Sequence, residues 1–137
     1  MAQHIRDVMT PDPVVLTASS DLREAAQAMR DRDIGDVLVS KDGQLCGMVT
    51  DRDMVVRGLA EGRTDARLGD VCSRELVTLA PDDAIEDAVR LMSQHAVRRL
   101  PVVENGNAVG MVSIGDLAVE RDRNSALADI SAAPANS

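Results

Sequence analysis

The sequence predicts an α+β fold in which two tandem β-α-β-β-α repeats pack as a pseudo-two-fold pair. The first observation is a duplication: Gly47–Asp53 returns as Gly110–Asp116, at an offset of 63 residues (110 − 47). That offset aligns residues 5–56 with 68–119, and 13 of the 52 pairs are identical, whereas ordinary composition would give about three. The second observation is that apolar strand patterns alternate with amphipathic helix patterns in both halves. We therefore expect the function to depend on two similar halves.

Each repeat begins with a short apolar strand, at 14–16 and 77–79, followed by an amphipathic helix. Ser20 is the predicted N-cap of the first helix, and Asp83, with Glu86 three places on, resembles a capping box for the second. One face of each helix is apolar and is predicted to be buried: Leu22, Ala25, Ala26 and Met29 in the first repeat, and Ile85, Ala88, Val89 and Met92 in the second.

Two further strands and a second helix complete each repeat. The strands are predicted at 37–39 and 45–49, then at 100–103 and 108–112, and the dipeptides Asp42-Gly43 and Asn105-Gly106 are typical hairpin turns. The second helices are expected at about 51–60 and 114–122. The predicted boundaries are therefore 8–65 for repeat 1 and 72–128 for repeat 2, with a tail at 129–137 that is expected to be disordered.

The composition excludes several classes of function. The 137 residues are 45% hydrophobic, which excludes a disordered chain, and they include no Phe, Tyr or Trp. Proteins that bind single-stranded nucleic acids stack bases on aromatic side chains, which are absent here. The formal net charge of −8 also opposes contact with a phosphate backbone. We therefore expect no nucleic-acid partner.

The sequence also indicates the cellular compartment of the protein and the redox state of its cysteines. No run approaches the roughly 20 apolar residues of a membrane span, and the first residues show no apolar signal region. Cys46 and Cys72 have no metal-binding or redox spacing and are interpreted as buried, reduced thiols. We expect a cytoplasmic protein without a membrane partner.

The duplicated motif has two interpretations. Thr50-x-x-Asp53 and Ser113-x-x-Asp116 are close to capping boxes, in which a hydroxyl and a carboxylate satisfy free helix N–H groups. However, a helix N-terminus directly after a strand is also an anion site, and a carboxylate one turn into the helix can accept hydrogen bonds from a ribose diol. The pattern is therefore typical either of a helix cap or of a nucleoside-phosphate site.

The order of landmarks resembles that of cystathionine β-synthase (CBS) domains. These landmarks are a strand, a helix with Met near its end, Arg98-Arg99-Leu100-Pro101-Val102, a turn glycine, and Gly110-Met111-Val112-Ser113-x-x-Asp116. Two such domains in tandem resemble a CBS pair, also called a Bateman module, and in particular short stand-alone bacterial proteins with two repeats. The resemblance implies a regulatory protein that binds an adenosine-containing ligand in the cleft between the repeats.

The resemblance assigns roles to individual residues. It implies that Asp53 and Asp116 bind ribose, that Thr50 and Ser113 supply hydroxyls, and that Arg98 and Arg99 reach phosphates. Its implied adenine-lining residues are Val14, Val77 and Val97. The first repeat departs from the pattern, because Asp36 stands in the place of Arg99 and no proline follows. Alternatively, the two arginines are a solvated helix end that offsets the helix dipole.

The expected function is that of a stand-alone sensor for AMP, ADP, ATP or a relative, which acts on an unknown regulated protein. The alternative is a structural interaction module in which the Asp motifs are only helix caps. No nucleophile is paired with a base, so we expect no enzyme and no required cofactor. His4 and His95 lack a cluster that would make a metal site. A homodimer is expected through the second helices, whose apolar residues are Met54, Val55 and Leu59, and Leu117 and Val119.

Overall fold

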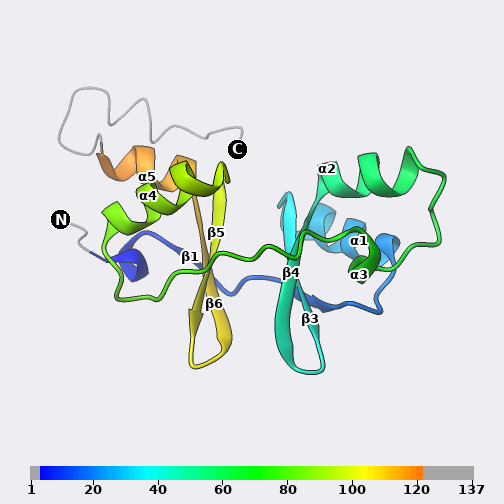
Figure 1. The fold of residues 1–137 in the computed structure, drawn as a ribbon, viewed down its shortest axis with the longest axis horizontal. Helices are drawn as coiled ribbons and strands as arrows, with labels where there is room; N and C mark the ends of the chain where they lie inside the picture. The colour runs from blue at the N-terminus through cyan, green and yellow to red at the C-terminus, as the bar shows by residue number, and fades with distance from the viewer. Residues whose placement is uncertain (1–3, 122–137) are drawn as a thin grey trace. The chain divides into compact units, whose positions relative to one another are not determined.

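The computed structural model describes residues 4–121 and divides the chain into two compact units (Figure 1). Unit 1 contains the residues up to Asp12 together with those from Val77 onward, and unit 2 is continuous from Pro13 to Leu76. The mixture of helices and strands in both units confirms the α+β class. The tail predicted at 129–137 lies outside the described residues. The repeat boundaries 8–65 and 72–128 remain a prediction about the sequence, and the compact units divide the chain at other points.

Unit 2 has one sheet of three strands in the order β2-β3-β4. The strand β2 (Val15–Thr17) runs parallel to β3 (Asp36–Lys41), which is antiparallel to β4 (Gln44–Thr50). The helix α1 (Leu22–Arg32) connects β2 with β3. After β4 come the short helix α2 (Asp51–Asp53), the π-helical segment η2 (Met54–Leu59) and α3 (Leu68–Val71).

Unit 1 also has one sheet of three strands, in the order β1-β6-β5, but its third strand lies beside β6, the counterpart of β4, and not beside β5. The strand β5 (Arg99–Glu104) and β6 (Asn107–Ser113) form an antiparallel hairpin, and β1 (Thr10–Pro11) pairs antiparallel with β6. The remaining elements are the 3-10 helix η1 (Ile5–Asp7), α4 (Ile85–His95) and α5 (Ile114–Arg121).

Each unit completes its sheet with a segment from the other sequence repeat. In unit 1, β1 lies against β6 with Thr10 opposite Met111. In unit 2, Ser73, which stands 63 residues after Thr10, exchanges two backbone hydrogen bonds of 2.9 and 3.0 Å with Met48 of β4. The chain therefore passes between the units twice, at 12–13 and at 76–77.

The hairpin turns form as predicted. Asp42 and Gly43 have φ angles of 54° and 78°, and Asn105 and Gly106 have 53° and 80°. Positive φ at both central residues is the geometry of a type I′ turn, whose twist matches that of the flanking strands. The Asx-Gly dipeptides therefore fix the register of both hairpins.

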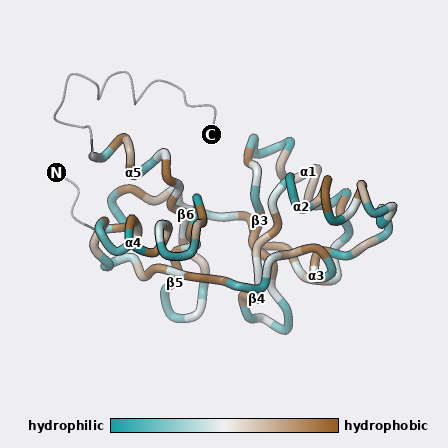
Figure 2. The backbone as a smooth tube through the Cα atoms, turned by 45° about the horizontal axis from the view of Figure 1, so that its top comes forward, coloured by the Kyte–Doolittle hydropathy of each residue, from teal (hydrophilic) through white to brown (hydrophobic). Residues whose placement is uncertain are grey.

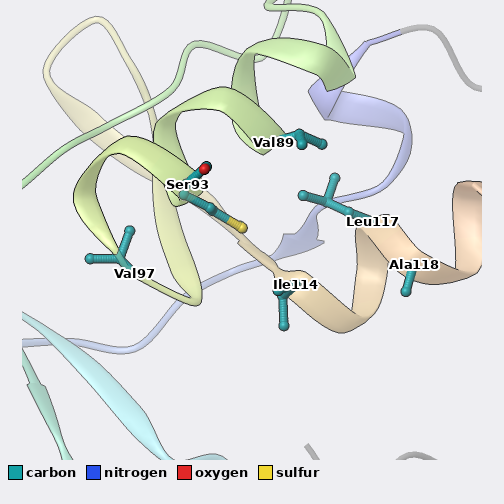
Figure 3. Close-up of a pocket in the computed structure, with 7 residues that line it drawn as sticks. Val89, Ser93, Val97, Ile114, Leu117 and Ala118 are labelled. Atoms are coloured by element: carbon teal, nitrogen blue, oxygen red, sulfur yellow. The ribbon is translucent and has the colours of Figure 1, made fainter.

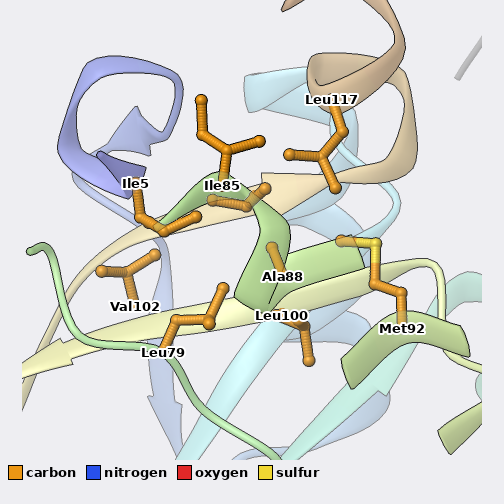
Figure 4. Close-up of a cluster of buried hydrophobic side chains, with 9 residues drawn as sticks. Ile5, Leu79, Ile85, Ala88, Met92, Leu100, Val102 and Leu117 are labelled. Atoms are coloured by element: carbon orange, nitrogen blue, oxygen red, sulfur yellow. The ribbon is translucent and has the colours of Figure 1, made fainter. Parts of the chain in front are cut away.

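Each unit has its own apolar core. Figure 4 shows the core of unit 1, where side chains of α4, β5 and α5 meet Ile5 and Leu79. The core of unit 2 is built from α1, β3 and β4 and the segment 66–72. Three consecutive positions of both β3 and β5 are buried, in agreement with the apolar colour along these strands in Figure 2. Burial of such a face is the main stabilising contribution in domains of this size.

Both predicted helix starts are wrong by one residue. Asp21, not Ser20, is the N-cap of α1, because its carboxylate accepts the N–H of Glu24 at 2.8 Å. Asp83 instead accepts the N–H of Ala80 at 2.8 Å, so α4 begins after Ala84. Ser and Asp are both favoured N-cap residues, so residue type alone does not give the helix start, and the turn before the helix decides between neighbouring positions.

Three further predictions about the elements are corrected. Residues 77–79 form no strand, only a parallel bridge from Leu79 to Val102, although two of the three equivalent residues 14–16 belong to β2. On α1, Ala26 is exposed, and Ala28 packs against the core instead. The helix predicted at 51–60 continues from α2 as a π-helical segment, with Ala60 donating to the carbonyl of Val55 at 2.8 Å.

Gly47 is the point where the exchanged segment meets β4. A Cβ atom at this position would lie 2.5 Å from the carbonyl oxygen of Ser73 and 3.0 Å from Sγ of Cys72. At Gly110, the equivalent atom would lie 2.9 Å from the carbonyl oxygen of Thr10 and 2.6 Å from Sδ of Met9. Only glycine therefore permits the backbone pairing that completes each sheet.

We predict that Gly47→Ala lowers the free energy of unfolding by about 1–3 kcal/mol, because the added methyl group forces β4 and the 72–73 segment apart. Urea unfolding followed by circular dichroism would measure the change. Gly115→Ala is the control, since its Cβ would be no closer than 3.6 Å to Ser113, and alanine in a helix is favoured by about 0.5–1 kcal/mol. Equal stability of the Gly47→Ala variant and the natural chain would contradict the close approach.

Candidate functional site

The first motif lies where β4 leads into α2. The Oγ1 atom of Thr50 accepts the N–H of Asp53 at 3.1 Å, and Oδ2 of Asp53 accepts the N–H of Thr50 at 2.9 Å. The two side chains thus form a complete capping box, and both are partly buried. The predicted cap is confirmed for this motif.

The second motif, where β6 leads into α5, has the same geometry. The Oγ atom of Ser113 accepts the N–H of Asp116 at 3.1 Å, and Oδ2 of Asp116 accepts the N–H of Ser113 at 2.9 Å. Ser113 and Asp116 are also partly buried. Two copies of one hydrogen-bonded arrangement therefore follow the third strand of each repeat.

The capping bonds leave part of each motif available for a ligand. Each box uses Oδ2 of its aspartate, and within residues 4–121 the Oδ1 atoms of Asp53 and Asp116 accept no hydrogen bond. Each hydroxyl is used as an acceptor, so its hydrogen can still be donated. A carboxylate oxygen beside a hydroxyl donor can bind a diol and an anionic oxygen together, and the cap and the ligand interpretations are therefore compatible.

Opposite charges stand beside the two motifs. In unit 1, Arg99 of β5 pairs in register with Ser113, and the carbonyl of Arg98 accepts the N–H of Ile114 at 2.9 Å. In unit 2, Asp36 of β3 pairs in register with Thr50. Arg99 and Asp36 both take part in further interactions of the structure. Each unit therefore places its own charged strand residue next to its own motif, positive in unit 1 and negative in unit 2.

The three predicted adenine-lining residues have different surroundings. Val14 and Val77 are partly buried against the cores of unit 2 and unit 1, respectively. Val97 lines an apolar hollow of about 460 Å³ between α4 and α5 (Figure 3). The volume falls within the range of small-molecule sites, but neither Ser113 nor Asp116 lines it.

Ile114 is a large apolar residue of the hollow to which the sequence analysis gave no role. It directly follows Ser113 and lines the hollow together with Leu117 and Ala118, one turn further along α5. Asp116 is two residues from Ile114, about 200° around the helix, and so belongs to another face. In the first repeat, Asp51 occupies the equivalent position. The sequence signal for the hollow was therefore an apolar residue directly after Ser113, at a position where the first repeat has an aspartate.

The described residues also bear on metal binding, membrane crossing and the burial of the two cysteines. Among residues 4–121, no group of three or more His, Cys, Asp or Glu side chains has the arrangement of a metal site. The helices within the same range are all too short or too polar to cross a membrane. Cys72 is buried as predicted, but Cys46 is only partly buried, which corrects the prediction of two buried thiols.

Comparison with known proteins gives one family for both repeats. The model of the CBS domain matches residues 5–58 and 68–122. The CBS domain-containing protein YhcV of Bacillus subtilis is 41% identical over 132 residues, which are 93% of this chain and 94% of YhcV. Hypoxic response protein 1 of Mycobacterium tuberculosis is 34% identical over 116 residues, which are 82% of this chain and 81% of that protein.

Solved structures share the fold. The crystal structure of Hypoxic Response Protein I with two coordinated zinc ions superposes with a TM-score of 0.75 at 34% identity, over 84% of this chain and 96% of that chain. The structure of CBSX2 in complex with AMP superposes with a TM-score of 0.73 at 23% identity, over 89% of this chain and 98% of that chain. The second likeness concerns the fold alone.

Proposed function

The chain belongs to the CBS domain family, and we propose that it is a cytoplasmic regulatory protein that binds an adenosine-containing nucleotide without catalysing its conversion. Each motif would contribute to a site of its own, one with Thr50 and Asp53 and the other with Ser113 and Asp116. The observation that carries the proposal is the duplicated capping box, which uses only one oxygen of each carboxylate. A cap alone needs one acceptor, so the second oxygen and the hydroxyl hydrogen are the groups offered to ribose and phosphate.

The polarity of the proposed ligand follows from the same groups. An acceptor carboxylate selects a donor such as a vicinal diol, and an N-terminal helix turn with a hydroxyl favours an anionic oxygen. A nucleoside phosphate combines both. CBSX2, which shares the fold, has been crystallised in complex with AMP, a nucleoside phosphate.

A structural interaction module is the second candidate. It is favoured by the capping bonds themselves, which are complete in both motifs without a ligand. The two candidates predict different effects of replacing a motif carboxylate by an amide. The amide oxygen can still cap the helix, but the second oxygen, which would accept a hydrogen bond from the ligand, is lost.

We predict that AMP, ADP or ATP raises the melting temperature, because a ligand at 100 times its Kd adds about 2.7 kcal/mol to stability. Asp53→Asn should weaken this binding roughly ten- to a hundredfold, since hydrogen bonds to a charged group contribute about 1.5–3 kcal/mol. Thermal unfolding and calorimetry with each nucleotide would measure both effects.

Asp70→Asn is the matched control. Its Oδ2 accepts the N–H of Arg67 at 2.9 Å, the same type of bond that Asp53 makes to Thr50. The control should bind nucleotide like the natural chain and show a similar small change in stability. If neither the natural chain nor any variant responds to nucleotides, the structural-module interpretation is correct.

We also propose that the two sites are unequal, with Arg98 and Arg99 serving the ligand bound by Thr50 and Asp53. The resemblance to CBS pairs implies that the motif of one repeat faces the strands of the other. The two arginines would then meet the phosphate with charge-assisted bonds, and Asp36 would repel a phosphate held by Ser113 and Asp116. We predict that Arg99→Ala abolishes tight AMP or ATP binding and that Asp116→Ala leaves it nearly intact, as measured by calorimetry. Because Arg99 lies in register with Ser113, the reverse order would assign the phosphate site to the motif of unit 1.

Self-association is part of the proposal. The side chains of Val55 and Leu59 in η2 are 55% and 63% exposed, as expected of surface available to a second copy. Leu117 was expected to contribute surface, but it is 3% exposed and belongs to the core of unit 1. Ile114, which is 49% exposed at the hollow, supplies apolar surface on α5 instead.

We predict that light scattering at micromolar concentration gives a particle of twice the chain mass of 14.6 kDa. Leu59→Glu should shift the particle toward the single-chain mass, because a charge in an apolar interface must be desolvated. Val15→Glu, a matched change at an exposed valine of β2, should leave the mass unchanged. A single-chain mass for the natural protein would contradict the homodimer.

A further inference from the structure

The strand β4 has a bulge that turns Cys46 toward the core of unit 2. Val39 pairs with Gly47 and Ser40 pairs with Leu45, so Cys46 is an additional residue on β4. In such a bulge the extra residue and its neighbour oppose a single residue of the partner strand, which reorients the extra side chain. Accordingly, Cys46 packs against the same apolar cluster that contains Cys72.

The second thiol lies directly over this bulge. The Sγ atom of Cys72 would be 3.0 Å from a Cβ atom on Gly47, the residue next to Cys46. The position of Cys72 is fixed on both sides, because its N–H donates to Leu68 at 2.9 Å and the following Ser73 pairs with Met48. The two cysteines therefore share one bulge on the core side of β4.

Unit 1 contains the same construction without thiols. Its bulge lies between Val102 and Val103, where Val109 is the additional residue, and Sδ of Met9 lies over Gly110. Val109 and Met9 are the residues that align with Cys46 and Cys72. The bulge thus brings two apolar side chains together in one unit and two thiols together in the other.

We propose that Cys46 and Cys72 form a reversible disulfide within the chain when the protein meets a hydroperoxide. The thiolate of Cys46 attacks the peroxide O–O bond, forming a sulfenic acid and releasing an alcohol or water. The thiol of Cys72 then attacks the sulfenic sulfur, forming the S–S bond and releasing one water. Two thiols are oxidised and one peroxide is reduced, so atoms and electrons balance.

The surroundings of the two thiols set the order of the steps. Cys46 is partly buried and so accessible to a small peroxide, while Cys72 is buried. Burial raises the pKa of the Cys72 thiol, and the nearby Cys46 thiol raises it further. A thiol with a raised pKa is a weak nucleophile toward peroxide, which leaves Cys46 as the first site of oxidation.

The disulfide would join the exchanged segment covalently to β4. The link lies at Cys46, four residues before Thr50, where the strand leads into the first capping box. Opening of the pairing between Met48 and Ser73 would then be prevented in the oxidised protein. The proposal does not depend on nucleotide binding.

The test uses the full reduced chain treated with equimolar hydrogen peroxide, blocked with iodoacetamide and digested with trypsin. Trypsin separates the thiols into peptides 42–52 and 68–74. We expect a linked pair of these peptides, two hydrogens lighter than their sum and cleaved by dithiothreitol, with loss of both alkylated forms. Alkylation of both thiols after peroxide, links between chains, or sulfinic acid alone would each overturn the proposal.

Two variants keep the result independent of the folding of any one protein. In Cys72→Ser, Cys46 should accumulate as a sulfenic acid that dimedone traps, while in Cys46→Ser the buried Cys72 should resist peroxide. In a third variant that lacks both natural cysteines, Met9→Cys with Val109→Cys should form the equivalent link in unit 1. Absence of that link in a folded variant would show that the bulge does not bring the side chains together.

Discussion

The close approach of backbones at Gly47 and Gly110 is the constraint on which the other features depend. A methyl group at either glycine would meet a carbonyl oxygen of the exchanged segment, Ser73 in unit 2 and Thr10 in unit 1. Without that approach, β4 and β6 would each have an unpaired edge, and unpaired edges favour wrong pairing partners. Because Thr50 and Ser113 follow three residues after these glycines, the same pairing also fixes the strand end from which each capping box begins.

The sequence predicted those features that short-range physics determines. The Asx-Gly turns require positive φ, which few residues tolerate, so both hairpins and their registers followed from two dipeptides. The capping boxes of the candidate site followed in the same way, because a hydroxyl and a carboxylate three residues apart complete each other's hydrogen bonds. The N-caps predicted at Ser20 and Asp83 were each one residue too early. Several acidic or hydroxyl residues follow one another there, and the preceding turn selects among them.

Features that depend on distant residues could not be predicted in this way. Periodicity in one repeat gives no information on which copy of the first segment completes its sheet, so the exchange was not anticipated. An apolar residue such as Leu117 can lie in an interface or in a core, and the sequence does not distinguish the two. In the structure, Leu117 is buried where α5 packs against α4. Similarly, alternation along β4 would place Cys46 and Gly47 on opposite faces, and the bulge, which arises from pairing with β3, changes that orientation.

The two repeats share a backbone structure but differ in side chains near the candidate site and the bulge. Gly47 and Gly110 are retained because each meets a carbonyl oxygen, and Gly43 and Gly106 because each has a positive φ. The motif carboxylates are retained because each accepts a backbone N–H. Some of the differences change the chemistry near the motif and the bulge: Asp36 corresponds to Arg99, Asp51 to Ile114, and Cys46 and Cys72 to Val109 and Met9. Charge beside the motif, the apolar hollow and thiol chemistry can each change in one copy without cost to the backbone. The duplicated motif therefore has different neighbouring side chains in the two units, and a functional difference between the units should arise from these differing residue pairs.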